Sequence, residues 1–194
     1  MKTKSALRAA AVAIGLIAAA PLGSAQDKSA PLELPVLVTS SGQALDAFTV
    51  KTLLGRAGVP VDYDAKAPVE KLDGKKTLII VAGASVKGFG AAGITAESEM
   101  ARTRSLLDTA KSKNIAIVGV HIGGTERRGG ASEQFVKAVG SAADRLVVTK
   151  EGDQDGYFSG VAKERGVPIT LIDRPIEVGP ALTQQFANAA KATN

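Results

Sequence analysis

Short, uninterrupted runs of apolar residues recur along this sequence, and each run is bounded by residues typical of turns. A run without polar alternation predicts a strand that is covered on both faces. Longer stretches with apolar residues at helical spacing lie between these runs. Parallel strands need crossover connections, so strands that alternate with helices predict a parallel sheet with helices on both faces. The predicted strands are residues 34–38, 59–63, 77–82, 115–120, 146–148 and 169–172.

The second predicted strand, residues 59–63, is the exception, because apolar and polar residues alternate in it and it contains Pro60. Proline lacks the N–H that a central strand donates, which places this strand at an edge of the sheet. The predicted fold is therefore a three-layer, doubly wound α/β domain of flavodoxin-like or Rossmann-like type, with about six strands in the order 2-1-3-4-5-6. Ligands of such sheets bind outside the carboxyl ends of the strands, where the chain order reverses between strands one and three.

One predicted helix begins at Thr95 and ends at Asn114. Thr95 can cap its first turn, where Glu97 and Glu99 suit the positive end of the helix dipole. The glycine-rich segment before it, residues 83–93, is predicted to be a loop. Basic residues occupy the surface away from the apolar face of this helix, and we expect all of them to be solvated: Arg102, Arg104, Lys111 and Lys113.

The first 25 residues have the features of a secretory signal peptide. Lys2, Lys4 and Arg8 precede an uncharged apolar segment, residues 9–20, and small residues lead to Ala25, after which we expect cleavage. The apolar segment has about twelve residues, fewer than the roughly twenty that span a bilayer, which argues against a retained membrane anchor. We therefore predict a periplasmic protein.

After the signal peptide, residues 26–33 are predicted to be a tether and residues 34–194 a single domain. The chain has 24 basic and 19 acidic residues, so removing the three basic residues of the signal lowers the net charge from +5 to +2. This small charge, without a basic run that contains aromatic residues, argues against nucleic acid binding. The absence of cysteine excludes disulfides and a lipid anchor on an acylated cysteine.

Polar and glycine-rich segments follow three strands that are predicted to end at the same edge of the sheet. Hydroxyl groups, free backbone amides at helix starts and guanidinium groups all bind carboxylates or phosphates. We therefore expect a small anionic molecule to bind at this edge. The candidate ligand-binding residues, in chain order, are Ser40, Ser41, Gln43, Ser85, Lys87, His121, Gly123, Gly124, Arg127 and Arg128.

Each of these candidates also has a structural interpretation. Ser40 and Ser41 are as well suited to turns and helix caps as to a ligand. Arg127 and Arg128 are adjacent and need not point the same way, so that one of them can belong to a surface ion pair. The glycines of residues 83–93 fit a loop, because the spacing matches neither a P-loop nor the dinucleotide fingerprint.

His121 is the only histidine of the chain. At the end of a buried strand it could act as a general base, donate to an anion, or donate to a neighbouring carbonyl. A serine hydrolase would pair it with a serine such as Ser85, but residues 83–87 lack the last glycine of the G-x-S-x-G motif. We predict no metal site, since one histidine without cysteine leaves too few ligands for zinc or copper.

Five characteristic segments follow one another in the chain: LPVLVTSSGQ, DYD, KTLIIVAGASVKGFGAAGI, VGVHIGGTERRGG and VVTKEGDQDGYF. In this arrangement the chain resembles a family of exported bacterial proteins, domain-of-unknown-function family 6305. The resemblance covers nearly all of the chain after the signal peptide, and the segment with the histidine, paired glycines and arginines is its most specific part. It implies an exported single domain with these loops, and it assigns neither catalytic residues nor a cofactor.

Three functions remain open from the sequence. The first is a periplasmic protein that binds a small anionic solute or serves as an accessory protein, without a cofactor. The chain is too short for two lobes that close over a ligand, so its pocket would be open or completed by a partner. The second is an exported hydrolase or transferase with His121 as general base. The third is a protein-interaction module of the cell envelope.

Overall fold

The computed structural model of this chain describes residues 30–186. The predicted signal peptide, its cleavage after Ala25 and the first part of the predicted tether lie outside the described residues. The described residues form a six-stranded parallel sheet with the order β2-β1-β3-β4-β5-β6, which confirms the predicted fold. The strands are β1 Val36–Ser41, β2 Val61–Tyr63, β3 Thr77–Ala82, β4 Ala116–His121, β5 Arg145–Thr149 and β6 Ile169–Ile172.

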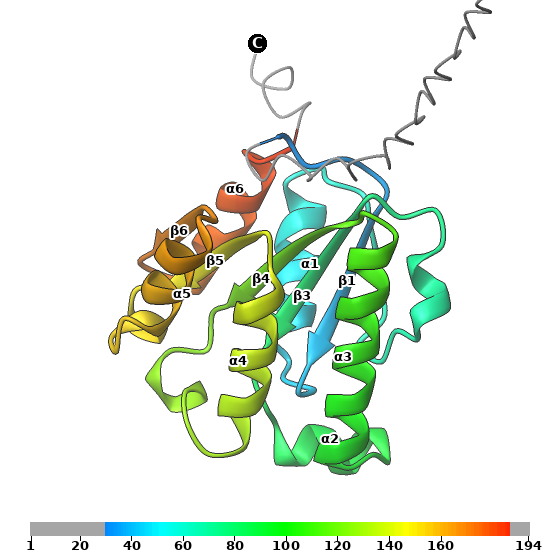
Figure 1. The fold of residues 1–194 in the computed structure, drawn as a ribbon, viewed down its shortest axis with the longest axis vertical. Helices are drawn as coiled ribbons and strands as arrows, with labels where there is room; N and C mark the ends of the chain where they lie inside the picture. The colour runs from blue at the N-terminus through cyan, green and yellow to red at the C-terminus, as the bar shows by residue number, and fades with distance from the viewer. Residues whose placement is uncertain (1–29, 187–194) are drawn as a thin grey trace, which may run out of the picture.

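Helices cover both faces of the sheet, so that the domain has three layers (Figure 1). One face is covered by α3 Ala96–Ser112, α4 Ala131–Ala142 and α5 Tyr157–Arg165, and the other by α1 Asp46–Arg56 and α6 Val178–Thr183. The short helix α2 Val86–Ala92 lies at the carboxyl ends of the strands. Within the described residues, four single-turn 3-10 helices complete the connections: η1 Val69–Leu72, η2 Thr125–Arg127, η3 Glu151–Asp153 and η4 Pro175–Glu177.

The edge position of β2 agrees with its proline. β2 pairs with β1 alone, from Val36 opposite Val61 to Val38 opposite Tyr63, and Pro60 directly precedes its first residue. The missing N–H of the proline therefore interrupts no ladder inside the sheet.

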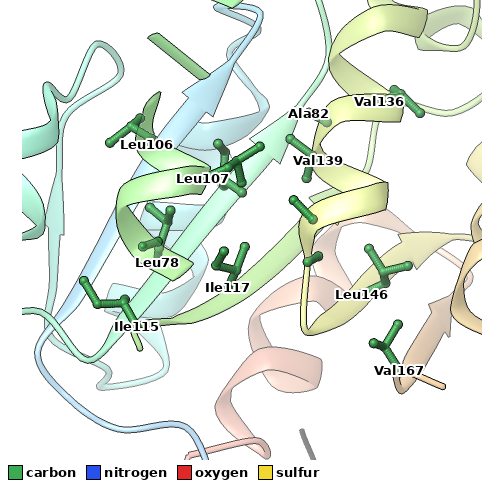
Figure 2. Packing of buried hydrophobic residues seen from close by; sticks show 14 of the residues in the cluster. Leu78, Ala82, Leu106, Leu107, Ile115, Ile117, Val136, Val139, Leu146 and Val167 are labelled. Carbon is green, nitrogen blue, oxygen red and sulfur yellow. The ribbon is translucent and has the colours of Figure 1, made fainter. Parts of the chain in front are cut away.

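Side chains of alternate strand residues fill the two spaces between the sheet and its helices. Figure 2 shows the space under α3 and α4, where Leu78, Ile117 and Leu146 from three strands pack with Leu107 and Val139 from the helices. All five side chains are at most 3% exposed. Full burial of each contributes about 1.5–3 kcal/mol, so this cluster fixes both helices, and the loops that precede them, against the sheet.

The glycine-rich segment before α3 differs from the prediction of a loop, because residues 86–92 form the helix α2. Glycine disfavours a helix interior by about 1 kcal/mol relative to alanine, which is why the composition indicated a loop. The Ser85 side chain caps the first turn by accepting from the Gly88 N–H at 3.0 Å, and Phe89 is buried beneath it. Gly93 then ends the helix in a left-handed conformation.

The two ends of the described chain meet at the amino ends of the strands. Leu32 is 1% exposed, donates its N–H to the Gln185 carbonyl at 2.7 Å and pairs with Phe186 in a parallel bridge. The packed body thus begins two residues before the predicted domain boundary at residue 34. Within residues 30–186, no helix combines the length and apolar character needed to span a bilayer.

Candidate functional site

The loops after β1 and β3 are joined by backbone hydrogen bonds at the carboxyl edge of the sheet. The Gly83 N–H donates to the Ser41 carbonyl at 2.9 Å, the Ser85 N–H to the Gly42 carbonyl at 2.8 Å, and the Ala44 N–H to the Gly83 carbonyl at 3.2 Å. This is the point at which the chain order reverses, since β2 and β3 lie on opposite sides of β1. The predicted meeting of these two loops is therefore found, but the space between them is closed by their own backbones.

A buried ion pair from α3 braces the β1 loop. The Glu99 side chain is fully enclosed, and Arg102 donates to it from Nε at 2.8 Å and from Nη2 at 2.7 Å. Glu99 Oε1 also accepts from the Gly42 N–H at 2.9 Å and from Gln43 Nε2 at 3.0 Å. Arg102 further donates to the carbonyls of Ala67 and Ser40. The expectation that Arg102 is solvated is wrong, because its charge compensates a carboxylate that has no access to water.

The candidate residues of the β1 loop are occupied by this packing. Gln43 Nε2 donates to Glu99 and also to the Ala65 carbonyl at 3.0 Å. Ser41 Oγ lies 3.1 Å from Thr103 Oγ1 in a buried hydrogen bond. Ser40 is fully buried on the other face of the strand, and its Oγ has no hydrogen-bond partner. The Ser40 hydroxyl is thus a buried polar group without a partner.

Five backbone amides at this edge are engaged in hydrogen bonds within the protein. The Gly42 N–H donates to Glu99, and the Ala84 N–H donates to Ser132 Oγ at 2.9 Å. The amides of Gly83 and Ser85 bind the β1 loop, as described above, and that of Gly88 binds its own cap. The expectation of free amides at the helix starts is therefore wrong at these positions.

His121, the last residue of β4, is completely buried. Its Nδ1 lies 2.9 Å from the Ala82 carbonyl oxygen and its Nε2 lies 3.4 Å from the Gly124 carbonyl oxygen. A neutral imidazole carries one N–H, so the shorter contact assigns the proton to Nδ1. The ring stacks on Phe158 with 5.4 Å between the ring centroids. The arrangement is that of a histidine that links β4 to β3 and to its own loop.

Burial lowers the pKa of His121 below its ordinary value, and the Ala82 and Gly124 carbonyls oppose this shift in part. Among the charged groups, Arg128 lowers the same pKa and Asp46 raises it. The loss of hydration outweighs the other influences, because the imidazolium form would have to be buried. His121 is thus held in its neutral form.

Arg128 holds the loop after β4 against the loop before α5. It donates to the Gly152 carbonyl at 2.7 Å and makes two hydrogen bonds to the Asp155 carboxylate, at 3.0 and 2.9 Å. Its guanidinium carbon lies 5.1 Å from the ring centroids of both Tyr157 and Phe158. With its side chain only 10% exposed, Arg128 has a structural role in this arrangement.

Arg127 differs from its neighbour. Its Nη1 donates to the Ala84 carbonyl at 3.3 Å, and among residues 30–186 no carboxylate oxygen lies within 4 Å of its guanidinium. The chain of Arg127 lies over Gly123, where a Cβ atom would come within 2.4 Å of Arg127 Cγ. A glycine at residue 123 is therefore required for this placement of the arginine.

Gly83 lies beside both Arg127 and Asp46. A Cβ atom built on Gly83 would lie 3.8 Å from Arg127 Cδ, 3.6 Å from Asp46 Oδ2 and 3.5 Å from Ala44 Cβ, all of which are ordinary contact distances. The structure thus has room for at least one more carbon atom here. Asp46 Oδ2 is buried and has no hydrogen-bond partner.

Two candidates remain, Lys87 and Gly124. Lys87 is exposed on α2, and the Gly124 carbonyl faces His121. Among residues 30–186, no group of three or more histidine, cysteine, aspartate or glutamate side chains is arranged to hold a metal ion.

Sequence reasoning missed Asp46 and the pair of Glu99 and Arg102 as residues of this edge. The helical spacing contained a signal for one of them, because Glu99 lies three residues after Ala96 and four before Thr103, on the inner face of α3. A charge at a core position needs a partner, and Arg102 is one turn further along. For Asp46, no comparable pattern exists in the sequence.

A protein-family model matches this chain. The model described as "Domain of unknown function (DUF6305)" matches residues 33–186, which is most of the chain and nearly all of the described residues. A comparison with curated proteins gave no match.

Proposed function

Because this chain belongs to the DUF6305 family, whose description names no activity, we propose a function from its geometry: the protein binds a small anionic molecule beside Arg127. The site lies at the carboxyl edge of the sheet, over Gly83, and needs no cofactor. The signal-like composition of the first 25 residues supports a periplasmic location for this binding.

The observation that carries the proposal is the state of Arg127. Its guanidinium makes one long hydrogen bond, to the Ala84 carbonyl, and among residues 30–186 no carboxylate oxygen lies within 4 Å of it. Most N–H donors of this guanidinium group are therefore available to a ligand. Such a group forms two parallel hydrogen bonds with a carboxylate or phosphate. Arg128, by contrast, already makes this pair of bonds with Asp155.

The groups around Gly83 indicate which class of anionic ligand fits the site. The unpartnered Asp46 Oδ2 is an acceptor beside the same point over Gly83 that the Arg127 side chain contacts. A carboxylate ligand without a donor would be repelled by Asp46, whereas a ligand with a hydroxyl or ammonium group next to its carboxylate would satisfy both side chains. Small hydroxy acids and amino acids have this chemistry, so we propose them as the ligand class.

A thermal-shift experiment with glycolate, glycine, acetate and phosphate tests the function. A ligand at 100 times its Kd stabilises the folded protein by about 2.7 kcal/mol, which raises the Tm of a domain of this size by about 5–10 °C. We expect this rise with glycolate or glycine, a smaller one with acetate, and its loss in Arg127→Gln. Arg56→Gln, an exposed arginine at the end of α1, is the matched control and should keep the shift.

Gly83→Ala supplies a second variant that should fold normally, since its added methyl group meets no atom closer than 3.5 Å. The methyl group would occupy the ligand's place, and we expect the thermal shift to disappear. If the shift survives both Arg127→Gln and Gly83→Ala, the proposed site is wrong.

The enzyme alternative has less support from the geometry. A general base must reach the proton that it removes, but His121 is 0% exposed and both ring nitrogens face backbone carbonyls. Ser85 is engaged as the cap of α2. Binding without turnover is therefore the function that we put forward.

One observation favours protein interaction as a second candidate. Three large apolar side chains at the carboxyl edge are exposed: Leu45 by 80%, Val86 by 76% and Phe48 by 52%. Exposed apolar groups at the start of α1 and α2 are typical of a surface that a partner covers. Sedimentation velocity tests the simplest partner, a second copy. A concentration-dependent dimer that is lost in Leu45→Ser/Val86→Ser would support this candidate, and a monomer at all concentrations would exclude self-association.

A further inference from the structure

A groove of about 590 Å³ lies between α3 and α4, and neither Arg127 nor Gly83 belongs to its lining. Its volume is within the range of small-ligand and peptide sites. One wall is formed by about two turns of α3 and the other by about two turns of α4, and Tyr157 at the start of α5 also lines the groove. The groove is lined by Arg104, Leu107, Asp108 and Lys111 of α3, by Gln134, Lys137, Ala138, Ser141 and Ala142 of α4, and by Tyr157.

The groove exists because α4 presents small side chains to α3 along this line. Ala138, Ser141 and Ala142 leave space that larger residues would fill, and Leu107 lies beneath it with only 3% of its surface exposed (Figure 2). The floor is therefore apolar, while the rim is formed by long polar side chains. This combination suits a ligand with an apolar centre and charged ends.

The charges on the rim are mainly positive. Arg104 and Lys111 project from α3 and Lys137 from α4, whereas Asp108 is the only acidic residue of the lining. Lys137 is paired with Glu133 at 3.3 Å, but among residues 30–186 no carboxylate lies within 4 Å of Arg104 or Lys111. Two cations of one wall thus have no partner from the described part of the chain, and the groove favours an anionic occupant.

We propose that this groove binds an acidic segment of a partner protein in an extended conformation, through two carboxylates that flank a small apolar residue. The spacing supports this occupant. Arg104 and Lys111 are seven residues apart, or about 10.5 Å along the helix axis. An extended chain rises about 3.3 Å per residue and its side chains alternate between two sides, so carboxylates two residues apart lie on one side, about 6.6 Å from each other, and the residue between them points to the other side, toward the floor. The side chains of Arg104 and Lys111 are long enough to converge on these two carboxylates. This site is independent of the one proposed at the carboxyl edge.

The test uses amide NMR spectra of the full chain during titration with the capped tripeptide acetyl-Glu-Ala-Glu-amide. Exposed ion pairs are individually weak, so we expect binding in the millimolar range that weakens with salt. The amide signals that move should be those of Leu107, Asp108, Ala138 and Ser141. The neutral peptide acetyl-Gln-Ala-Gln-amide should shift these signals at least tenfold less at the same concentration.

Three variants separate the groove from general charge effects. Lys111→Glu should reduce the affinity at least tenfold, because it reverses one of the two unpaired cations. Lys163→Glu makes the same change of net charge on α5, outside the lining, and should keep the affinity within twofold. Ser141→Phe fills the groove from an exposed position and should abolish binding while keeping all charges. Equal effects of the two lysine changes, full binding by Ser141→Phe, or no movement of these signals by the acidic peptide would each overturn the proposal.

Discussion

The buried pair of Glu99 and Arg102 leads to a quantitative prediction about the carboxyl edge. Arg102→Met keeps the aliphatic stem of the side chain and removes the guanidinium. The Glu99 carboxylate, which is 1% exposed, then keeps two of its four hydrogen bonds, those from the Gly42 N–H and Gln43 Nε2. We expect a large loss of stability, because a buried charge loses its counter-charge and cannot regain water.

The magnitude follows from the fate of the orphaned carboxylate. Removing one partner of a buried ion pair costs about 3–5 kcal/mol. The Arg102 side chain is 16% exposed, so that some water reaches the pair, and we expect the lower part of this range, about 3–4 kcal/mol. Arg102→Lys keeps the charge without the paired N–H donors and should lose about half as much.

Urea denaturation followed by circular dichroism measures this loss. With a slope of about 2 kcal/mol per molar urea, Arg102→Met should lower the unfolding midpoint by about 1.5–2 M at an unchanged slope. Arg104→Met, an exposed arginine on the same helix, should change the free energy of unfolding by no more than about 0.5 kcal/mol. If Arg102→Met costs as little as Arg104→Met, the pair does not stabilise the edge and our reasoning about the brace is wrong.

Two further changes test other parts of the same edge. His121→Gln removes the only histidine of the chain. Burial lowers the pKa of His121 in the folded state, so the unfolded state binds more protons below pH 6.5. As the pH drops from 7.5 to 5, the free energy of unfolding of the natural protein should therefore fall relative to that of the variant, by at most about 1.4 kcal/mol per pH unit. Identical pH profiles in urea titrations would contradict the assignment. Gly42→Ala forces a side chain into a left-handed conformation with φ +105°, its Cβ 2.5 Å from the Gly83 carbonyl oxygen, and should cost about 3 kcal/mol or more, whereas Gly90→Ala meets no atom within 4 Å inside α2 and should stabilise by about 0.5–1 kcal/mol. If calorimetry finds that both alanine variants change the Tm of the natural protein in the same direction, this prediction is wrong.

The strand order could be predicted because it depends on patterns within short segments. Uninterrupted apolar runs marked the central strands, and Pro60 marked the edge. The same rule misplaced the end of β1, predicted at Val38 and observed at Ser41. Residues 39–41 are polar but buried, and the hydroxyl of Ser41 is satisfied by Thr103 from α3. A buried polar residue looks like the beginning of a turn until its partner is known.

The internal bonding of the edge could not be predicted, because its partners are far apart in the sequence. The Gly42 N–H and the Glu99 carboxylate are 57 residues apart. The sequence indicated which loops meet, but not which donors they use on each other. The roles of the two adjacent arginines could not be predicted for the same reason. Arg128 binds Asp155, which is 27 residues away in the sequence, whereas the Arg127 side chain lies beside Gly83. Their different roles depend on the direction of each side chain, which no local pattern determines.

The parallel bridge between Leu32 and Phe186 has a practical consequence for handling the molecule. Both ends of the described chain lie at the amino ends of the strands, opposite the carboxyl edge of the sheet (Figure 1). A sensor chip or bead that captures the protein through either end would therefore leave the opposite rim facing the bulk solution, and a linker that joins the two ends would have to cross only a short gap.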